Sequence, residues 1–289
     1  MTDASVPIPA FTPRAVPSEA SRWAKMRYLV RIYWRLIGLQ LRTFVEYRGD
    51  FWIGMVGAAL LQGSSLVFIG ALFSRLPSVG GWTLWEVALL YGFTLIAYGT
   101  REVLCDGPWT LRATINKGEF DRLLVRPLSP ALQTATLIAS IHGIANAALG
   151  WIVLLVAAHR VGLAWTPWTV FWVVLTVVCG TVIVSCVAYL ANIIGFWEPG
   201  TSSAFPFMIA NLVELVKFPL ELYGWLIRVG VTAVLPFAFI SYYPVLVLLD
   251  KNSPVRWLGY LTPLVTAMFV GVTAWSWRKS VDRYQGVGH

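Results

Sequence analysis

Long stretches without a charged residue divide the chain into regular blocks. Asp, Glu, Lys and Arg are absent from seven segments, at residues 51–74, 87–100, 127–159, 161–197, 199–213, 229–249 and 257–277. A helix needs about 20 consecutive apolar residues to cross the hydrocarbon core of a bilayer. Most of these segments are long enough, so the pattern predicts an all-α integral membrane protein.

A different pattern precedes the first uncharged segment. Between residues 18 and 48, one face of the expected helix is apolar, formed by Trp23, Met26, Val30, Tyr33, Ile37, Leu41 and Phe44. Basic residues occupy mainly the other faces, which is typical of an amphipathic helix at the membrane interface. A helix that packs on a soluble partner is the alternative. Residues 1–17 contain four prolines and no apolar run, which predicts a flexible tail.

Residues 49–280 are predicted to form one transmembrane domain with six membrane spans. The expected spans are 51–74, 83–104, 131–158, 168–195, 201–218 and 257–277. The further apolar segment 226–249 is interrupted by Pro236 and Pro244, each of which removes a backbone donor and kinks a helix. We therefore expect a re-entrant element on the outer side. Hydropathy alone does not decide whether 201–218 or 226–249 is the span.

The basic residues indicate the orientation of the spans. Of the 22 Lys and Arg residues, sixteen lie before residue 50, between the second and third spans, or after residue 277, against four in the alternate connections. Cytoplasmic loops carry such an excess of Lys and Arg. Both termini, including a short tail at residues 281–289, are therefore expected in the cytoplasm. The net charge of +8 follows from this asymmetry, and we expect no nucleic-acid partner.

The loop between the second and third spans contains a short amphipathic segment. Residues 119–126 can form one or two helical turns, with Phe120, Leu123 and Leu124 on an apolar face beside Arg122 and Arg126. Apolar residues surrounded by charges suit docking to a soluble protein. An amphipathic loop with no partner is the alternative interpretation.

Three stretches of sequence resemble those of a known family. They are Gly-Glu-Phe-Asp-Arg-Leu-Leu-Val-Arg-Pro-Leu-Ser-Pro at 118–130, Phe-Pro-Leu-Glu-Leu-Tyr at 218–223 with Leu-Pro-Phe-Ala-Phe-Ile-Ser-Tyr-Tyr-Pro at 235–244, and Glu-Tyr-Arg-Gly-Asp-Phe-Trp at 46–52. Together they are similar to the ABC-2 type exporter permeases of the bacterial branch in which two permease genes usually accompany one ATPase gene.

The resemblance implies a six-span fold with an N-terminal connecting helix, a cytoplasmic coupling helix and an outer re-entrant pair. It places the contact with the ATPase at Gly118, Glu119, Phe120, Asp121, Arg122, Leu123, Leu124, Arg126 and Pro127. Phe120 and Leu124 would be the buried anchors of that contact. It also implies a substrate cavity between the two permeases, lined largely by spans two and five. Those spans would contribute Tyr91, Tyr98, Phe207, Met208 and Asn211, for each of which a lipid-facing or helix-packing role is the alternative.

Motifs for other chemistry are absent from the chain. It has no G-x-x-x-x-G-K-[ST] phosphate loop, so ATP and Mg are expected on a partner ATPase dimer, and the chain itself is expected to bind no cofactor or metal. The expected function is the permease subunit of an exporter in the bacterial inner membrane, beside a second permease that is either a sister chain or another copy. It would move a hydrophobic or amphipathic substrate outward. A secondary ion-coupled transporter is the alternative, followed by a membrane-embedded enzyme.

Overall fold

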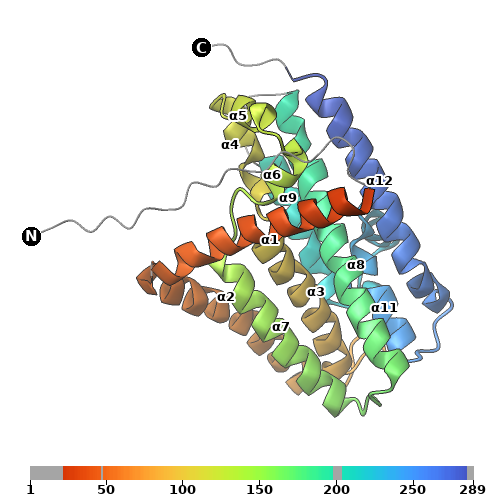
Figure 1. Cartoon of the computed structure of the whole chain (residues 1–289). Coiled ribbons are helices and arrows are strands. Elements are labelled where there is room, and N and C mark those ends of the chain that lie inside the picture. Colours follow the sequence, from red (N-terminus) through yellow and green to blue (C-terminus); the bar gives the residue numbers. More distant parts are fainter. Residues whose placement is uncertain (1–21, 47, 198–203, 285–289) are drawn as a thin grey trace, which may run out of the picture.

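The protein is a helical bundle whose long helices run in alternating directions (Figure 1). The computed structural model describes residues 22–46, 48–197 and 204–284, so the predicted tail at 1–17 and residues 285–289 lie outside this part. Within it, five helices are long and apolar enough to cross a membrane: α2 (Arg48–Arg75), α3 (Leu84–Leu104), α7 (Ile141–Arg160), α8 (Pro167–Asn192) and α12 (Thr262–Val281). These helices and the bent pair described below make it an all-α integral membrane protein.

Shorter elements connect the long helices. Between α3 and α7 lie η1 (Gly107–Thr110), α4 (Leu111–Asn116), α5 (Phe120–Val125) and α6 (Pro130–Ala135). After α8 come η2 (Ile193–Phe196), α9 (Ala204–Asn211), η3 (Leu212–Lys217), η4 (Leu220–Leu222), α10 (Trp225–Val229), η5 (Gly230–Val234), η6 (Pro236–Phe239), α11 (Tyr242–Leu248) and η7 (Arg256–Leu261). The α4 and α5 helices lie at one end of the bundle, called here the α5 end (Figure 1).

Glycines bring α3 and α7 into direct backbone contact. A methyl group added at Gly99 of α3 would lie 2.7 Å from the carbonyl oxygen of Gly143 in α7, and one added at Gly150 would lie 2.8 Å from the backbone nitrogen of Ile96. Small residues allow helices in a membrane to approach this closely, and the packing of the two backbones then stabilises the pair. The two helices therefore form one rigid unit.

The N-terminal helix α1 (Arg22–Glu46) crosses the bundle near the α5 end (Figure 1). The Tyr33 hydroxyl donates a hydrogen bond of 2.6 Å to the carbonyl of Leu104, at the last residue of α3. Burial raises the pKa of Tyr33 to about 12, so the phenol remains a donor at neutral pH. Of the predicted apolar face, Ile37 is buried whereas Trp23 and Met26 are exposed, so only part of it packs on the bundle.

The predicted third span, 131–158, is wrong as a continuous helix. Residues 131–135 belong to the separate helix α6, and α7 begins only at Ile141. A carbonyl left free at this break accepts a hydrogen bond from a side chain of α1: the Gln40 amide donates to the Leu137 carbonyl at 2.9 Å. On the other side of the break, the Ser140 amide donates to the Glu102 carbonyl at 3.0 Å. Tertiary hydrogen bonds thus replace helical ones, which hydropathy does not reveal.

The segment from α10 to α11 is sharply bent. Trp225–Val234 and Pro236–Leu248 meet at an angle of 71°. Pro236 begins η6 directly after the bend, and Pro244 lies in the first turn of α11. Proline is tolerated at both places because an amide in the first turn of a helix has no intrahelical partner.

Both ends of this bent segment contact the same loop, which joins α2 to α3. On the entering side, the Trp82 indole N–H donates to the Glu221 carboxylate at 3.2 Å. On the leaving side, the Lys251 ammonium donates to the Gly81 carbonyl at 2.8 Å. The chain therefore returns to the end of the bundle at which it entered, so this segment is re-entrant.

The predicted fifth span, 201–218, consists of two short pieces where it is described. These are α9 and the 3₁₀ helix η3. Pro206 of α9 borders a small cavity together with Trp109, close to the α5 end, whereas Glu221, just beyond η3, reaches the loop at the opposite end. The segment therefore runs the length of the bundle, although neither piece alone is long enough to span a membrane.

Replacing Gly99 by alanine should destabilise the fold. The added methyl group would meet the backbone of α7, which cannot move aside as a side chain could, and overpacking of this kind costs about 1–3 kcal/mol. We expect a lower unfolding midpoint in detergent, measured by tryptophan fluorescence. The Gly57→Ala variant is the control, because no atom lies within 4 Å of a methyl group at that position. Equal midpoints for the two variants would contradict close packing of α3 on α7.

Cysteines introduced on either side of the bent segment should react from the same side of the membrane. Gly224 precedes α10 and Asn252 follows α11, and both are exposed. We expect Gly224→Cys and Asn252→Cys to be labelled by an impermeant maleimide added outside intact cells, whereas Lys117→Cys should be labelled only after the membrane is opened. Labelling of position 224 and position 252 from opposite sides would show that the segment crosses the bilayer.

Candidate functional site

The segment between α3 and α7 at the α5 end is the candidate site, called here the coupling segment (residues 107–130). Its helices α4 and α5 are joined by a tight turn at Gly118, whose φ angle of 69° favours glycine. The Gly118 amide donates to the Ile115 carbonyl at 3.0 Å, and the Glu119 amide donates to the Thr114 carbonyl at 2.9 Å. This is the hydrogen-bond pattern of a Schellman motif. Gly118 thus serves to reverse the chain.

Phe120 packs inside the protein and is fully buried. Its ring lies edge-on to the rings of Phe196 and Tyr284, with both centroids 5.0 Å away, and 6.3 Å from the ring of Trp277. Edge-to-face contacts of this kind add to the free energy gained by burying aromatic area. These four side chains are called here the aromatic cluster.

The prediction that Phe120 anchors a partner protein is therefore wrong for this conformation. The aromatic cluster covers the ring completely, so nothing of it remains for a partner to contact. Leu123 is also buried. The reason is tertiary: η2 at the end of α8 and the last turn of α12 both converge on α5 and supply the aromatic partners.

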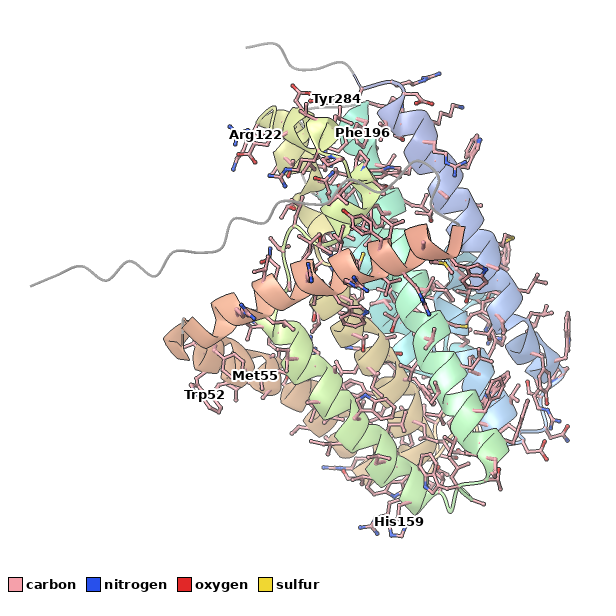
Figure 2. The ribbon with its side chains drawn as sticks, in the orientation of Figure 1. Trp52, Met55, Arg122, His159, Phe196 and Tyr284 are labelled. Atoms are coloured by element: carbon pink, nitrogen blue, oxygen red, sulfur yellow. The ribbon has the colours of Figure 1, made fainter. Side chains whose placement is uncertain are left out.

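The other side of α5 is exposed and apolar at its centre. Leu124 is 42% exposed and Val125 is 83% exposed. Charged residues surround them, since Asp121, Arg122 and Arg126 are exposed as well. Figure 2 shows Arg122 pointing away from the bundle at the same end as Phe196 and Tyr284. This surface, called here the α5 surface, can contact a protein that approaches from beyond that end.

The remaining predicted contact residues lie at the edges of the α5 surface. Glu119 and Pro127 are exposed, and Gly118 is half-buried. Of the nine predicted residues, the structure thus places seven at or near the surface and turns two inward. Val125, which was not among the predicted contacts, is the most exposed apolar residue of the segment.

Hydrogen bonds from α6 hold the end of α5 in place. The Gln133 amide donates to the carbonyl of Leu123 and to the carbonyl of Leu128, both at 2.8 Å. The Leu123 carbonyl is free because a helix leaves its last acceptors unpaired, and Leu128 lies between α5 and α6. On the opposite side, Gly195 of η2 packs against the side chain of Arg112 in α4. The coupling segment is therefore fixed from two directions.

A buried ion pair lies where α3 joins the coupling segment, and Asp106 is the residue directly before that segment. The Arg101 guanidinium, in the last turn of α3, donates to Asp106 at 2.7 Å and lies 4.8 Å from the centre of the Tyr98 ring. Burial raises the pKa of Asp106, and the charge of Arg101 offsets part of that rise. Next to Arg101, Glu102 accepts a hydrogen bond of 2.8 Å from Asn146 of α7. A displacement of the coupling segment is thus transmitted directly to α3 and α7.

The five predicted cavity residues do not line one cavity. Tyr91 is fully buried, and its hydroxyl donates to the Gln62 side chain of α2 at 2.7 Å. Tyr98 borders a cavity of about 10 Å³ between α3, α8 and α9, which is room for roughly one water molecule. Phe207 and Met208 are 66% and 55% exposed, and Asn211 is exposed too. Within one chain these five side chains therefore share no cavity, and the cavity expected between two permeases stays a prediction.

Comparison with known families agrees with this architecture. The model of the family described as "ABC-2 family transporter protein" matches residues 59–288, which is well over half of the chain and includes the coupling segment. The chain belongs to this family. No curated protein and no solved structure gives a significant match. The ABC-2 family comprises membrane components of ABC transporters, so the chain is a transporter component and not itself a catalyst.

The side chains that hold α5 in this ABC-2 permease were not recognised from the sequence. Phe196, Trp277 and Tyr284 come from parts of the chain that are distant in sequence from Phe120. One feature of the sequence could have indicated them. All three lie at or just after the ends of expected spans, on the side of the membrane where the coupling segment was also expected. Within the described residues, no group of three His, Cys, Asp or Glu side chains could hold a metal ion.

Substituting Phe120 by alanine should lower the stability of the permease much more than substituting Leu124. Removal of a fully buried ring costs about 3–5 kcal/mol, whereas Leu124 is partly exposed. We expect a clear fall of the unfolding midpoint in detergent for Phe120→Ala and little change for Leu124→Ala. An unchanged midpoint for Phe120→Ala would mean that the ring is on the surface and available to a partner.

Proposed function

We propose that the chain is the permease subunit of an ATP-driven exporter and that a separate ATPase dimer binds the α5 surface from the cytoplasm. The observation that carries the proposal is the combination of two faces on one short helix. Leu124 and Val125 face outward among charges, while Phe120 is held by the aromatic cluster. Such a helix can receive force on one side and pass it on through the other.

Two connections would carry the movement from the ATPase into the membrane. The Arg101–Asp106 ion pair and the glycine contacts connect the coupling segment to α3 and α7 as a unit. The aromatic cluster connects it to the ends of α8 and α12. Closure of the ATPase dimer around ATP would therefore tilt several spans together. ATP and Mg belong to the partner, since this chain has no phosphate-binding loop.

A second permease, either another copy or a sister chain, would complete the transport path. The cavity between α3, α8 and α9 is far too small for a substrate, whereas Phe207, Met208 and most of the apolar side chains of α2 are exposed. Pairing of two permeases through this side would enclose a path lined by apolar and aromatic side chains. A hydrophobic or amphipathic molecule would move along it from the bacterial inner membrane or cytoplasm to the outside.

A secondary transporter remains the second candidate. Glu214 and Lys217 form an ion pair in η3, within the length of the bundle, and intramembrane charges often belong to ion pathways. An ion-coupled transporter would work without an ATPase, so the two functions predict opposite results when ATP is removed.

The test is a double substitution on the α5 surface. Leu124→Asp with Val125→Asp places two carboxylates in its apolar centre, where their desolvation opposes binding, and we expect loss of ATPase co-purification and of ATP-driven transport in inverted vesicles. Ser129→Asp is the matched control, because it introduces a carboxylate on an exposed residue of the same segment outside that centre. Unfolding midpoints should stay unchanged in both variants.

Two results would refute the proposed function. One is retention of the ATPase by the double variant at wild-type stoichiometry. The other is transport that continues when ATP is exhausted and a proton gradient is maintained, which would favour the secondary transporter.

A further inference from the structure

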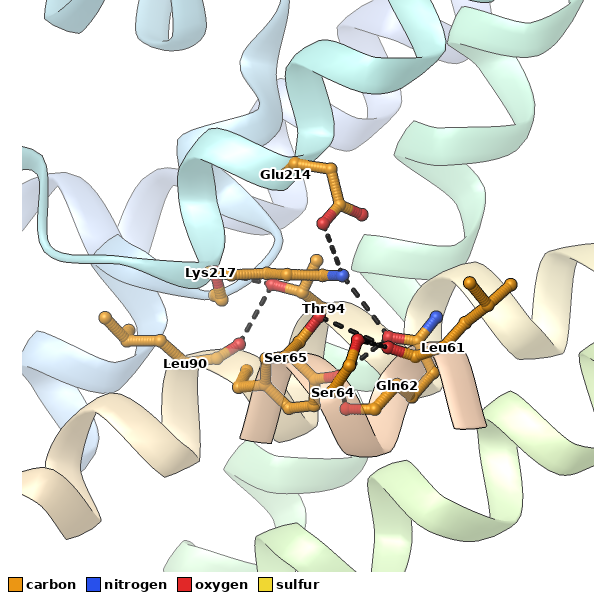
Figure 3. Close-up of polar contacts among 10 residues, drawn as sticks. Leu61, Gln62, Ser64, Ser65, Leu90, Thr94, Glu214 and Lys217 are labelled. Atoms are coloured by element: carbon orange, nitrogen blue, oxygen red, sulfur yellow. Dashed lines mark hydrogen bonds and ion pairs between the residues drawn. The ribbon is translucent and has the colours of Figure 1, made fainter. Parts of the chain in front are cut away.

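An ion pair lies deep in the bundle, outside the coupling segment. The Lys217 ammonium of η3 donates to the Glu214 carboxylate at 2.6 Å and to the Gln62 side-chain oxygen at 3.5 Å (Figure 3). Gln62 is near the middle of α2, so the pair lies between the two ends of the bundle and not in a connecting loop. The Tyr91 ring lies under the ammonium, 5.0 Å from its centre. These contacts fix Lys217 against α2 and α3.

The backbone around this ion pair is also fixed. The Ser241 hydroxyl donates to the carbonyl of Val216 at 2.8 Å and accepts from Thr94 at 3.1 Å. All three of these residues are buried. η3 is therefore attached to α3 and to the re-entrant element, and the charged side chains project from a rigid support.

The two charges differ in accessibility. The side chain of Lys217 is 6% exposed, whereas that of Glu214 is 55% exposed. One carboxylate oxygen of Glu214 is bonded to Lys217, and the other has no hydrogen-bond partner among the described residues. A carboxylate that faced lipid at this depth would be costly, so it must face an aqueous path, another chain or a ligand. A molecule that approaches this pair meets the carboxylate first.

A cavity of about 250 Å³ opens beside Glu214, and Lys217, Ser64, Ser65, Phe68, Tyr91 and Phe218 border it as well. Apart from the Lys217 ammonium, which is bonded to Glu214 and Gln62, the polar groups of this wall offer hydrogen-bond acceptors. Both serine hydroxyls donate to the Leu61 carbonyl of their own helix, and the Tyr91 hydroxyl donates to Gln62. Their free lone pairs are therefore what a ligand would meet.

Acceptors, one accessible carboxylate and three aromatic side chains match a protonated amine. An ammonium group donates hydrogen bonds to acceptors and is attracted to the faces of aromatic rings. An anion would be less suited, since the Lys217 side chain is only 6% exposed and its ammonium is already bonded to Glu214 and Gln62. Drug-sized ligands fill about 300–1,000 Å³, so this cavity holds the charged end of a molecule and leaves its apolar part outside, beside α2 and α9.

We propose that Glu214 and the cavity beside it bind the ammonium group of amphipathic amines, which are then the substrate class of the transporter. That the bound amine is a substrate rests on the proposed function. The binding itself requires no ATPase. Lys217 is the counter-ion of this carboxylate in the unliganded chain, and it competes with the ligand for the carboxylate. The alternative is that a basic side chain of a second permease occupies the cavity, and the test below distinguishes the two.

Binding can be measured with dansylcadaverine, a fluorescent primary amine, and with its neutral N-acetyl derivative. The full chain, with any subunit that co-purifies, is placed in lipid nanodiscs and titrated with each probe. We expect the amine to bind at least about tenfold more tightly than the acetylated probe. Glu214→Gln should remove this preference, Glu214→Asp should retain most of it, and Asp250→Asn, which removes a carboxylate from an exposed loop, should leave it unchanged.

Lys217→Gln distinguishes a cation site from an anion site. Without the competing ammonium, the Glu214 carboxylate should bind the amine as tightly as before or more tightly, whereas an anion site would lose affinity. The proposal is overturned if Glu214→Gln binds both probes as the wild type does, or if Lys217→Gln weakens amine binding. It is also overturned if a thiol–amine bifunctional reagent joins Glu214→Cys to a lysine of a neighbouring permease, because a basic side chain then occupies the cavity. Because the titration needs no ATP, these outcomes are independent of ATPase docking on the α5 surface.

Discussion

The burial of one aromatic ring determines how the coupling segment is attached to the membrane helices. Phe120 lies among Phe196, Trp277 and Tyr284, which belong to the ends of α8 and α12. A short helix such as α5 is unstable by itself, because few residues share the cost of ordering it. Its position is therefore decided by these ring contacts and by the Gln133 hydrogen bonds, and the exposed α5 surface exists only because the opposite face is occupied.

The bundle divides into a tightly packed part and an open part. α3 and α7 touch through glycines, and α8 packs on both α3 and α12. By contrast, α2 and α9 keep large apolar side chains exposed, with the Glu214 carboxylate beside them. Rigid helices transmit displacement, while an exposed face with a charge at membrane depth requires something to cover it. The proposed force transmission and the proposed substrate contact thus involve different parts of one chain.

Prediction from sequence succeeded where a single local property decides the outcome. Long uncharged segments identified α2, α3, α8 and α12, and two prolines indicated the bent segment at 225–248. The loop at 118–130 was singled out by its resemblance to the ABC-2 family, and the family match includes it. Prediction from sequence failed where residues distant in the chain meet. The helix expected at 131–158 is broken, and carbonyls left free at the break accept hydrogen bonds from Gln40.

Hydropathy and charge were sufficient to establish a membrane-embedded helical protein and the approximate limits of its helices, because lipid requires backbone hydrogen bonds to be satisfied within each span. They could not tell which face of a short amphipathic helix is buried. Phe120 and Leu124 are both apolar and only four residues apart, yet one is enclosed and the other exposed. That difference, like the position of Lys217 behind Glu214, depends on side chains contributed by other helices, which only the packing of the bundle brings together.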